Sequence, residues 1–368
     1  MVALSFGIDN LPYGSVIAAD GRRFAAVRFE DSVLDLGAIN AELFAEGTLD
    51  SFLATGPDGW DDVRGRVIET LVADRVDLVP LDTLRPVLAF SVADFVDFYA
   101  SEHHATNAGR MFRPGAAPLP SHWKRVPIGY HGRSGSVVVS GTDIERPAGM
   151  VDDNTFTSTR RLDFEAEVGF VIGRPGRRIT VAEADEHVFG VCLVNDWSAR
   201  DVQGYETVPL GPFLGKSFAT SVSAWITPMA ALESARVTTV QDPVPAAHLR
   251  ESDPGHGLDL QLEVSINATV VSRPVFRALY WTWAQMLAHL TSNGAPVRTG
   301  DLYASGTVSG PERGQRGCLL ELGWNGTEPV ELNDGSTRLW LADGDEVTIR
   351  ASAGTLTLAE VSGRVVPG

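Results

Sequence analysis

The order of apolar and polar residues along the chain predicts mainly β-structure. The continuous apolar run from Val188 to Val194 is typical of a strand buried on both faces. Alternation from Leu341 to Val366, interrupted by turns at Gly344 and Gly354, predicts antiparallel strands. We also expect strands at 137–139, after Gly300, and at 319–322, where Glu321 would lie among leucines and need a partner.

Helical spacing is less common. Two amphipathic segments and one segment that is apolar on more than one side predict helices at Ala38 to Ala45, Asp61 to Val72 and Phe276 to Leu290, the last ending at Asn293-Gly294.

Two shorter segments carry side chains that could take part in catalysis or metal binding. Asp97 and His104 are seven residues apart in a stretch with helical spacing, so we expect them on one face of a helix. They would form either a metal ligand and a base or a structural hydrogen-bonded pair. Residues 198–203 predict a helix that Asp196 could cap and that would place Arg200 and Gln203 on the same side.

The short segment from Leu162 to Val168 alternates apolar and acidic residues. On a strand, Asp163, Glu165 and Glu167 would share one face, where three carboxylates repel each other. A solvated edge strand would tolerate them, but a cation bound by oxygens would stabilise them in the interior. We therefore treat this strand as a candidate metal site.

The turns divide the chain into two regions. Residues 1–88 are expected to form a small unit of short strands, and residues 84–87, which contain Pro86, are expected to form a linker. Residues 89–368 contain all the candidate chemistry and would form the larger unit. A chain of 368 residues is long enough for two domains.

Composition restricts the function. A formal net charge of −17 argues against nucleic-acid and anionic-membrane partners. No apolar run could span a bilayer, and the N-terminus lacks a signal-peptide pattern, so we expect a cytoplasmic protein. The absence of Rossmann and phosphate-loop glycine patterns predicts no nucleotide cofactor. The two cysteines, Cys192 and Cys318, have apolar neighbours and are expected to be buried thiols.

Lysine is rare in this chain. Only Lys124 and Lys216 occur among 30 basic residues, so arginine is the usual surface cation. A compact ammonium suits a tight cavity better than a planar guanidinium does. Lys216, within the segment 209–218, is therefore a candidate site residue, whereas Lys124 is expected at the surface.

Several segments together resemble the fumarylacetoacetase family. They are DFVDFY at 94–99 with HATN at 104–107, PIGYHGR at 127–133, LDFEAE at 162–167, NDWSARD at 195–201, PLGPFLGKSF at 209–218 and ASGTVSGP at 304–311. Their shared order covers most of the chain. The resemblance implies a small SH3-like barrel, a larger β-roll of mixed strands with some helix, and a homodimer.

The resemblance also implies roles for individual residues. It implies a Mg²⁺ or Ca²⁺ site formed by Asp97, Glu165, Glu167 and Asp196, with Lys216 and Thr220 nearby. An all-oxygen ligand set independently favours such hard cations over zinc. His104 would be the general base and Glu321 its orienting acid. The oxyanion would be stabilised by Arg200, Gln203 and Lys216, and the substrate would contact Tyr99, Arg113, Tyr130, Gln203 and Thr307.

The implied reaction is hydrolysis of the carbon–carbon bond of 4-fumarylacetoacetate, a dicarboxylate β-diketone, to fumarate and acetoacetate. This is the last step of tyrosine and phenylalanine catabolism in the family. One position departs from the family pattern, because Thr207 stands where a tyrosine is common, with Tyr205 nearby. Two alternatives stay open: a related enzyme that acts on an acylpyruvate or β-keto acid, and a calcium-binding β protein without activity.

Overall fold

The N-terminal unit is a small twisted sheet next to two helices. The computed structural model describes residues 5–73, 76–251 and 255–368. The strand order is β4-β3-β2-β1, with β5 also paired to β1. The bounds are β1 (Tyr13–Ile17), β2 (Arg23–Phe29), β3 (Ser32–Asp35), β4 (Val79–Pro80), β5 (Arg85–Val87), α1 (Asp50–Leu53) and α2 (Pro57–Val72).

Two predictions for this unit are wrong. Residues 84–87 are not a linker, because Arg85–Val87 pairs with β1 along one edge of the sheet, a position that tolerates Pro86. Ala38 to Ala45 forms turns, since the Asn40 side chain accepts the N–H of Leu43 and competes with helix formation. The helix predicted at Asp61 to Val72 is confirmed as part of α2.

The same sheet continues into the larger unit, because β1 pairs with β18. From there the order is β18-β15-β13-β24-β6-β7, and β17 joins β15 to β8. Every residue of β13 and β15 is buried, which confirms the strand predicted at Val188 to Val194. The bounds are β18 (Trp225–Pro228), β15 (Val188–Asp196), β13 (Ala166–Ile172), β24 (Asp301–Ala304), β6 (Asp94–Phe98), β7 (Gly129–His131), β17 (Thr220–Val222) and β8 (Val137–Val139).

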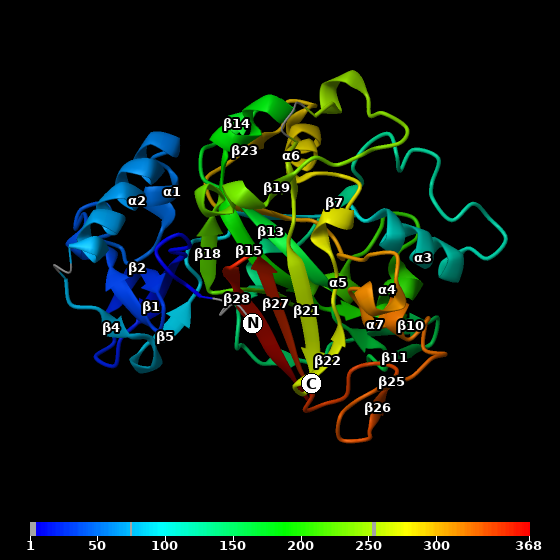
Figure 1. The fold of residues 1–368 in the computed structure, drawn as a ribbon. Coiled ribbons are helices and arrows are strands. Elements are labelled where there is room, and N and C mark those ends of the chain that lie inside the picture. Colours follow the sequence, from blue (N-terminus) through cyan, green and yellow to red (C-terminus); the bar gives the residue numbers. More distant parts are fainter. Residues whose placement is uncertain (1–4, 74–75, 252–254) are drawn as a thin grey trace.

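A second sheet lies beside the first in the larger unit (Figure 1). Its order is β22 (Thr269–Ser272), β21 (Gln261–Ile266), β27 (Glu346–Ala353), β28 (Leu356–Val366) and β9 (Ile144–Glu145). The antiparallel pair β27–β28 confirms the antiparallel strands predicted from the alternation between Leu341 and Val366. Gly354 has φ +59° in the turn between them.

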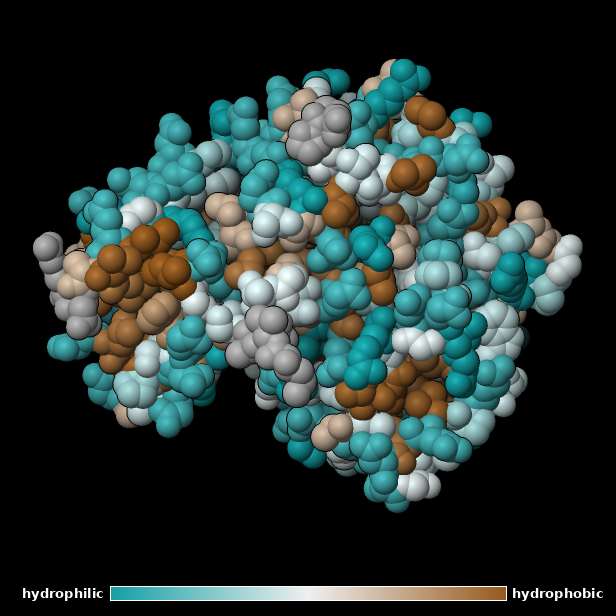
Figure 2. All heavy atoms as spheres, in the orientation of Figure 1, coloured by the Kyte–Doolittle hydropathy of each residue, from teal (hydrophilic) through white to brown (hydrophobic). Residues whose placement is uncertain are grey.

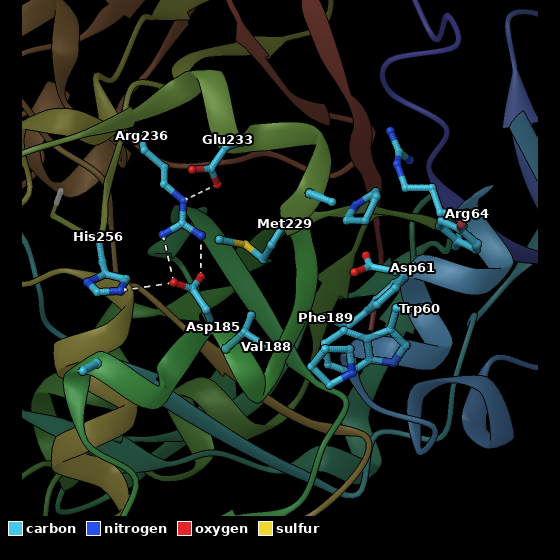
Figure 3. A pocket seen from close by; sticks show the side chains of 15 residues that line it. Trp60, Asp61, Arg64, Asp185, Val188, Phe189, Met229, Glu233, Arg236 and His256 are labelled. Atoms are coloured by element: carbon cyan, nitrogen blue, oxygen red, sulfur yellow. Dashed lines mark hydrogen bonds and ion pairs between the residues drawn. The ribbon is translucent and has the colours of Figure 1, made fainter.

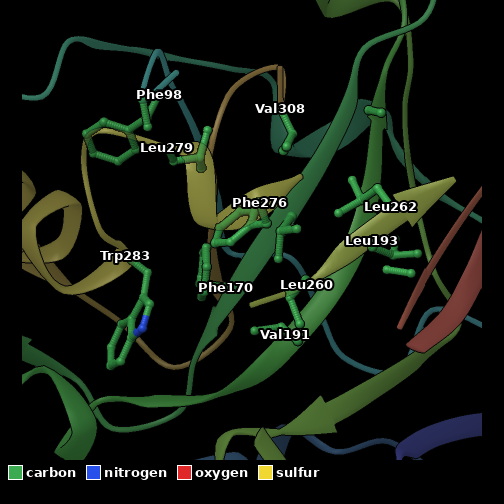
Figure 4. Close-up of a cluster of buried hydrophobic side chains, with 14 of the residues drawn as sticks. Phe98, Phe170, Val191, Leu193, Leu260, Leu262, Phe276, Leu279, Trp283 and Val308 are labelled. Atoms are coloured by element: carbon green, nitrogen blue, oxygen red, sulfur yellow. The ribbon is translucent and has the colours of Figure 1, made fainter. Parts of the chain in front are cut away.

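The main hydrophobic core lies between these elements. Figure 4 shows Phe170 of the first sheet beside Phe276 and Trp283, and Leu193 of the same sheet beside Leu262 of β21. Phe170 and Trp283 stack with ring centroids 6.0 Å apart. Burying each such side chain contributes roughly 1.5–3 kcal/mol, so this core stabilises the sheets that carry the site.

The buried helix α6 (Trp283–Thr291) begins later than predicted. Thr282 is its N-cap and forms a capping box with Gln285, whereas Phe276–Ala278 is a separate 3₁₀ turn. The predicted end is confirmed, since Gly294 has φ +94° just after the helix.

The remaining helices and strands are short. None of the described helices combines the length and apolar character that crossing a bilayer requires. The bounds are α3 (Glu102–Phe112), α4 (Arg200–Glu206), α5 (Leu214–Ser217), α7 (Leu319–Leu322), β10 (Ala148–Asp152), β11 (Thr155–Ser158), β12 (Leu162–Asp163), β14 (Gly176–Arg177), β16 (Ser198–Ala199), β19 (Arg236–Val237), β20 (Gly257–Leu258), β23 (Pro296–Val297), β25 (Val330–Glu331) and β26 (Thr337–Arg338).

The two units meet around a cavity of about 460 Å³. Figure 3 shows Trp60 and Arg64 of α2 on one side and an ion-paired group, Arg236 with Asp185, on the other. Trp60 packs edge-on against Phe189 at 5.4 Å. Figure 2 shows a largely hydrophilic surface in this view, with an apolar area over the N-terminal unit. The expected mainly β architecture, a small N-terminal unit before a larger mixed-sheet unit, is confirmed.

Candidate active site

Four acidic side chains from three separate strand regions meet in the interior of the larger unit. Asp97 lies in β6, Glu165 just before β13, Glu167 in β13, and Asp196 at the end of β15. All four are buried, and one oxygen of each lies within 4.8 Å of the others. In the sheet, Ala304 of β24 is the register partner of Asp97 and of Gly169 in β13. β24 therefore lies between β6 and β13 and sets the distance between Asp97 and the acids of the β13 region.

A lysine and two hydroxyl groups bind this acidic cluster directly. Lys216 Nζ is 2.5 Å from Glu165 Oε2 and 2.7 Å from Asp196 Oδ2. Thr220 Oγ1 donates to Asp196 at 3.0 Å, and the Tyr130 hydroxyl lies 2.9 Å from both Asp97 and Asp196. Burial by itself would lower the pKa of Lys216, but Asp196 and Glu165 raise it above its ordinary value. Lys216 is therefore an ammonium that neutralises part of the cluster.

Asp163, the acid of the alternating segment that lies outside this cluster, is paired with an arginine. Arg200 contacts Asp163 at 2.8 Å and Glu165 at 2.7 Å, and donates to Gln203 Oε1 at 3.1 Å. Asp163 also accepts the backbone N–H groups of Leu319 and Leu320. Of the two alternatives for the acidic residues, the buried one holds, because cations pair with Asp163 and Glu165. The segment is not one strand, however: β12 ends at Asp163 and β13 begins at Ala166.

Part of the cluster is unsatisfied. Asp97 Oδ1 and both Glu167 oxygens are buried without a hydrogen-bond partner in the described part of the chain. Burial and the neighbouring acids raise the pKa values of Asp97 and Glu167. Four carboxylates with one lysine carry a net charge of −3 when ionised. A divalent cation would satisfy these oxygens, so the residues fit a metal site.

His104 and Glu321 form a hydrogen-bonded pair. His104 Nδ1 is 2.6 Å from Glu321 Oε2. Burial would raise the pKa of Glu321, but the His104 ring together with hydrogen bonds from His104, Asn107 and Ser309 lowers it to about 2. Glu321 is therefore ionised and holds the imidazole in one orientation.

Three local predictions in this region are wrong. Asp97 and His104 do not share a helix, because Asp97 is in β6 and α3 begins only after Ser101, whose side chain caps His104 N–H. Glu321 lies in the short helix α7 and not in a strand. Asp196 does not cap α4, since β16 intervenes and Ala199 is the N-cap residue.

Of the residues expected to contact the substrate, some lie close to the site and others are exposed away from it. The Tyr99 ring packs edge-on against His104 at 5.3 Å, and the Thr307 hydroxyl is buried without a partner among the described residues. Arg113 is exposed at the end of α3, where it donates to Pro118 O at 2.6 Å. Tyr205 is exposed and bonds to Asp153. Neither Arg113 nor Tyr205 makes a hydrogen bond to the acidic cluster.

A cavity of about 340 Å³ adjoins the acidic cluster. Asp196, Lys216 and Thr220 line its inner part, and Arg133 and Phe213 belong to the loops around it. A small molecule could therefore reach the acids from this side. Cys192 and Cys318 are free and buried, which confirms the prediction of two buried thiols.

Sequence reasoning missed two residues that support Glu321. Asn107 donates to Glu321 Oε1 at 2.8 Å, and Ser309 donates to Oε2 at 2.7 Å. Asn107 is three residues after His104, a spacing that places both on one face of α3 and could have identified it. Nothing in the sequence pattern indicates Ser309.

Comparison with known proteins identifies relatives over nearly the whole chain. The family models "Fumarylacetoacetase N-terminal" and "Fumarylacetoacetate (FAA) hydrolase C-terminal" match residues 9–94 and 94–365. The fumarylacetoacetase of Caenorhabditis elegans is 40% identical, covering 98% of this chain and 96% of its own. The human fumarylacetoacetase is 39% identical with the same coverage.

Solved structures with lower identity share the fold. A fumarylacetoacetate hydrolase from Exiguobacterium antarcticum is 17% identical with a TM-score of 0.57, covering 97% of this chain and 100% of its own. A maleylpyruvate hydrolase from Sphingobium, in complex with manganese and pyruvate, is 15% identical with a TM-score of 0.60 and the same coverage. The matches to both family models and to relatives at about 40% identity show that this chain is an enzyme of the fumarylacetoacetate hydrolase family.

Proposed function

We propose that this enzyme hydrolyses 4-fumarylacetoacetate to fumarate and acetoacetate and depends on Mg²⁺ or Ca²⁺. The observation that carries the proposal is a buried His104–Glu321 pair near four acids with unsatisfied oxygens, in a chain about 40% identical to fumarylacetoacetases over its whole length. In the family that this chain belongs to, this reaction would be the last step of tyrosine and phenylalanine catabolism.

The metal would be held by Asp97, Glu165, Glu167 and Asp196. Their oxygens match the preference of hard cations, and no sulfur or imidazole from the described residues belongs to this cluster. Lys216 and Thr220 would fix the orientation of Asp196. A bound divalent cation would supply Lewis-acid polarisation of the substrate oxygens.

His104 is the proposed general base. Because Nδ1 is bonded to Glu321, Nε2 is the nitrogen that takes a proton from water. The hydroxide adds to the carbonyl carbon on the fumaryl side, and Arg200, Gln203 and Lys216 stabilise the developing negative charge. The carbon–carbon bond then breaks with its electron pair leaving on the acetoacetate carbon, which takes the proton back from His104.

The substrate carries a carboxylate at each end, and polar groups must receive both. Tyr99, Tyr130 and Thr307 are the nearest candidates, because Tyr99 contacts His104, Tyr130 binds the acids, and the Thr307 hydroxyl is unpaired. Arg113 would bind one carboxylate after releasing Pro118 O. Without a tyrosine at Thr207, this chain has one fewer aromatic contact, because Thr207 Oγ1 bonds to Gln203 O.

We also propose that the enzyme is a homodimer. The support is an exposed apolar segment beside the cavity, in which Val208 is 83%, Leu210 96% and Phe213 59% exposed. A monomer rarely leaves such large apolar side chains together in water. Light scattering with size-exclusion chromatography tests this, and a 39.5 kDa particle at micromolar concentration would contradict it.

The function itself is tested by purified enzyme, with Mg²⁺ or Ca²⁺, in an assay that follows the loss of fumarylacetoacetate absorbance. An acylpyruvate and a β-keto acid are compared under the same conditions. We expect the highest kcat/KM for fumarylacetoacetate. No turnover with either ion, or a clear preference for an acylpyruvate, would overturn the proposal.

A further inference from the structure

The carboxylate of Glu321 is held by more groups than its pairing with His104 requires. Oε2 accepts from His104 Nδ1 at 2.6 Å and from Ser309 Oγ at 2.7 Å, while Oε1 accepts from Asn107 Nδ2 at 2.8 Å. The Cys318 thiol is 3.4 Å from Oε2. Both oxygens are therefore bound, which fixes the plane of the carboxylate as well as its position.

Ser309 is linked by hydrogen bonds to both the backbone and the ring of His104. The Ser309 carbonyl accepts the Ser101 hydroxyl at 3.0 Å, and Ser101 Oγ accepts the backbone N–H of His104 at 3.1 Å. Gly317 N–H donates to Ser309 Oγ at 3.1 Å, so the single hydroxyl proton of Ser309 is directed to Glu321. One residue thus holds the His104 backbone through Ser101 and its ring through Glu321.

Asn107 adds a second, independent restraint. It lies on α3 three residues after His104, so one helix presents both side chains to the same carboxylate. Because Asn107 binds Oε1 and His104 binds Oε2, rotation of the Glu321 carboxylate would break both bonds.

We propose that Asn107 and Ser309 are positioning residues that keep the Glu321 carboxylate ionised and immobile, so that His104 always carries its proton on Nδ1 and presents Nε2 as the base. This inference rests on the proposed role of His104 as the base. Neither residue touches the substrate in this scheme, and both act through Glu321.

The surroundings allow the effect to be isolated. Tyr99, Cys318 and Glu165 are the other titratable groups that face this pair, and Glu102 and His103 lie beside His104 on α3. Burial first, and the charge of Glu321 second, raise the pKa values of Tyr99 and Cys318, which stay neutral. Glu165 is ionised and paired with Lys216 and Arg200. None of these contacts involves Asn107 or the Ser309 hydroxyl.

The test is nitrogen NMR of histidine-labelled, Mg²⁺-loaded enzyme across a pH series, together with kinetics. In Ser309→Ala and in Asn107→Leu, the carboxylate has one donor fewer and attracts the protonated ring more strongly. We expect the titration midpoint of the His104–Glu321 pair to rise by about one pH unit. We expect kcat to fall roughly 10- to 100-fold with KM within about twofold.

Ser223→Ala is the matched control. Ser223 is a buried serine that accepts Leu193 N–H and donates to Trp225 O, away from the site, so its loss lowers stability and leaves the midpoint unchanged. The proposal is wrong if both positioning variants fold and titrate like the wild type. Because the midpoint is measured without substrate, it decides this point even if the wild type fails to turn over fumarylacetoacetate, a result that would refute only the proposed function.

Discussion

Glu165 and Glu167 lie two residues apart, yet their surroundings differ. Glu165 is paired with Lys216 and Arg200, whose charges outweigh burial and lower its pKa. Glu167 makes no ion pair within the described part of the chain, and both its oxygens lack a hydrogen-bond partner there. Burial and three neighbouring acids raise its pKa, against a smaller opposing effect of Lys216. Removing charge from Glu165 would break buried ion pairs, at a cost of about 3–5 kcal/mol even without metal. Glu167 is therefore the cleaner probe of metal binding.

Glu167→Gln is expected to separate metal affinity from stability. Without metal, the variant should be as stable as the wild type or more stable, since it removes one buried charge among acids. With saturating Mg²⁺, the wild type gains about 2.7 kcal/mol at 100 times its Kd, and the variant gains much less. Urea unfolding with chelator and with Mg²⁺ measures both values. An identical gain from Mg²⁺ in both proteins would exclude Glu167 as a ligand.

His104→Ala is expected to abolish turnover while leaving metal affinity nearly unchanged, because His104 is not part of the acidic cluster. The loss should be at least 10²-fold, as for removal of a general base. His103→Ala is the adjacent control and should keep activity near the wild-type level. Calorimetric Mg²⁺ titration accompanies the assay, and parallel loss of activity and metal binding would favour a structural role.

At the scale of elements, the residue at which a helix begins determines where its side chains lie, as α3 shows for His104. Ser101 begins α3 only three residues before His104, and Thr282 begins α6, which carries no proposed site residue. Each side chain caps a backbone N–H, which contributes roughly 0.5–2 kcal/mol. The two caps thus contribute comparably to the stability of the protein, but only the cap of α3 lies next to a proposed catalytic residue.

Ser101→Ala and Thr282→Ala form a matched pair. Both should lower the free energy of unfolding by roughly 1 kcal/mol. Only Ser101→Ala should also lower kcat, because Ser101 Oγ ties the His104 backbone to the Ser309 carbonyl. Denaturant melts and steady-state kinetics on both variants check this. Equal kcat values for the two variants would show that the cap does not position the base.

At the scale of the whole molecule, Glu321 makes the free energy of unfolding depend on pH. Its pKa is lowered in the folded protein to about 2 from an ordinary 4.5, so its stabilising contribution is present above about pH 4.5 and is lost as pH falls toward 2. We expect Glu321→Gln to be less stable than the wild type at pH 7, with the difference shrinking over this window. Unfolding at pH 7, 5 and 3.5 tests the sign, and a constant difference would contradict it.

The sequence by itself determined the strands with the strongest patterns and the kinds of atoms in the site. Val188 to Val194 is a buried strand because no polar residue interrupts it. Repulsion among Asp163, Glu165 and Glu167 left either a solvated edge or nearby cations, and burial then leaves the cations that pair with Asp163 and Glu165. The motifs around His104, Lys216 and the acids were enough to indicate the family.

Only the tertiary structure decided which of these groups meet, and in what local form. The stretch from Asp97 to His104 was expected to be one helix, but pairing of β6 with β24 makes its first part a strand and brings Asp97 to Glu167 and Asp196. Ser309 reaches Glu321, 12 residues later, because the intervening loop folds back, and such a contact leaves no periodic signal in the chain. Periodicity reports which side of an element is buried, whereas long-range pairing sets its neighbours.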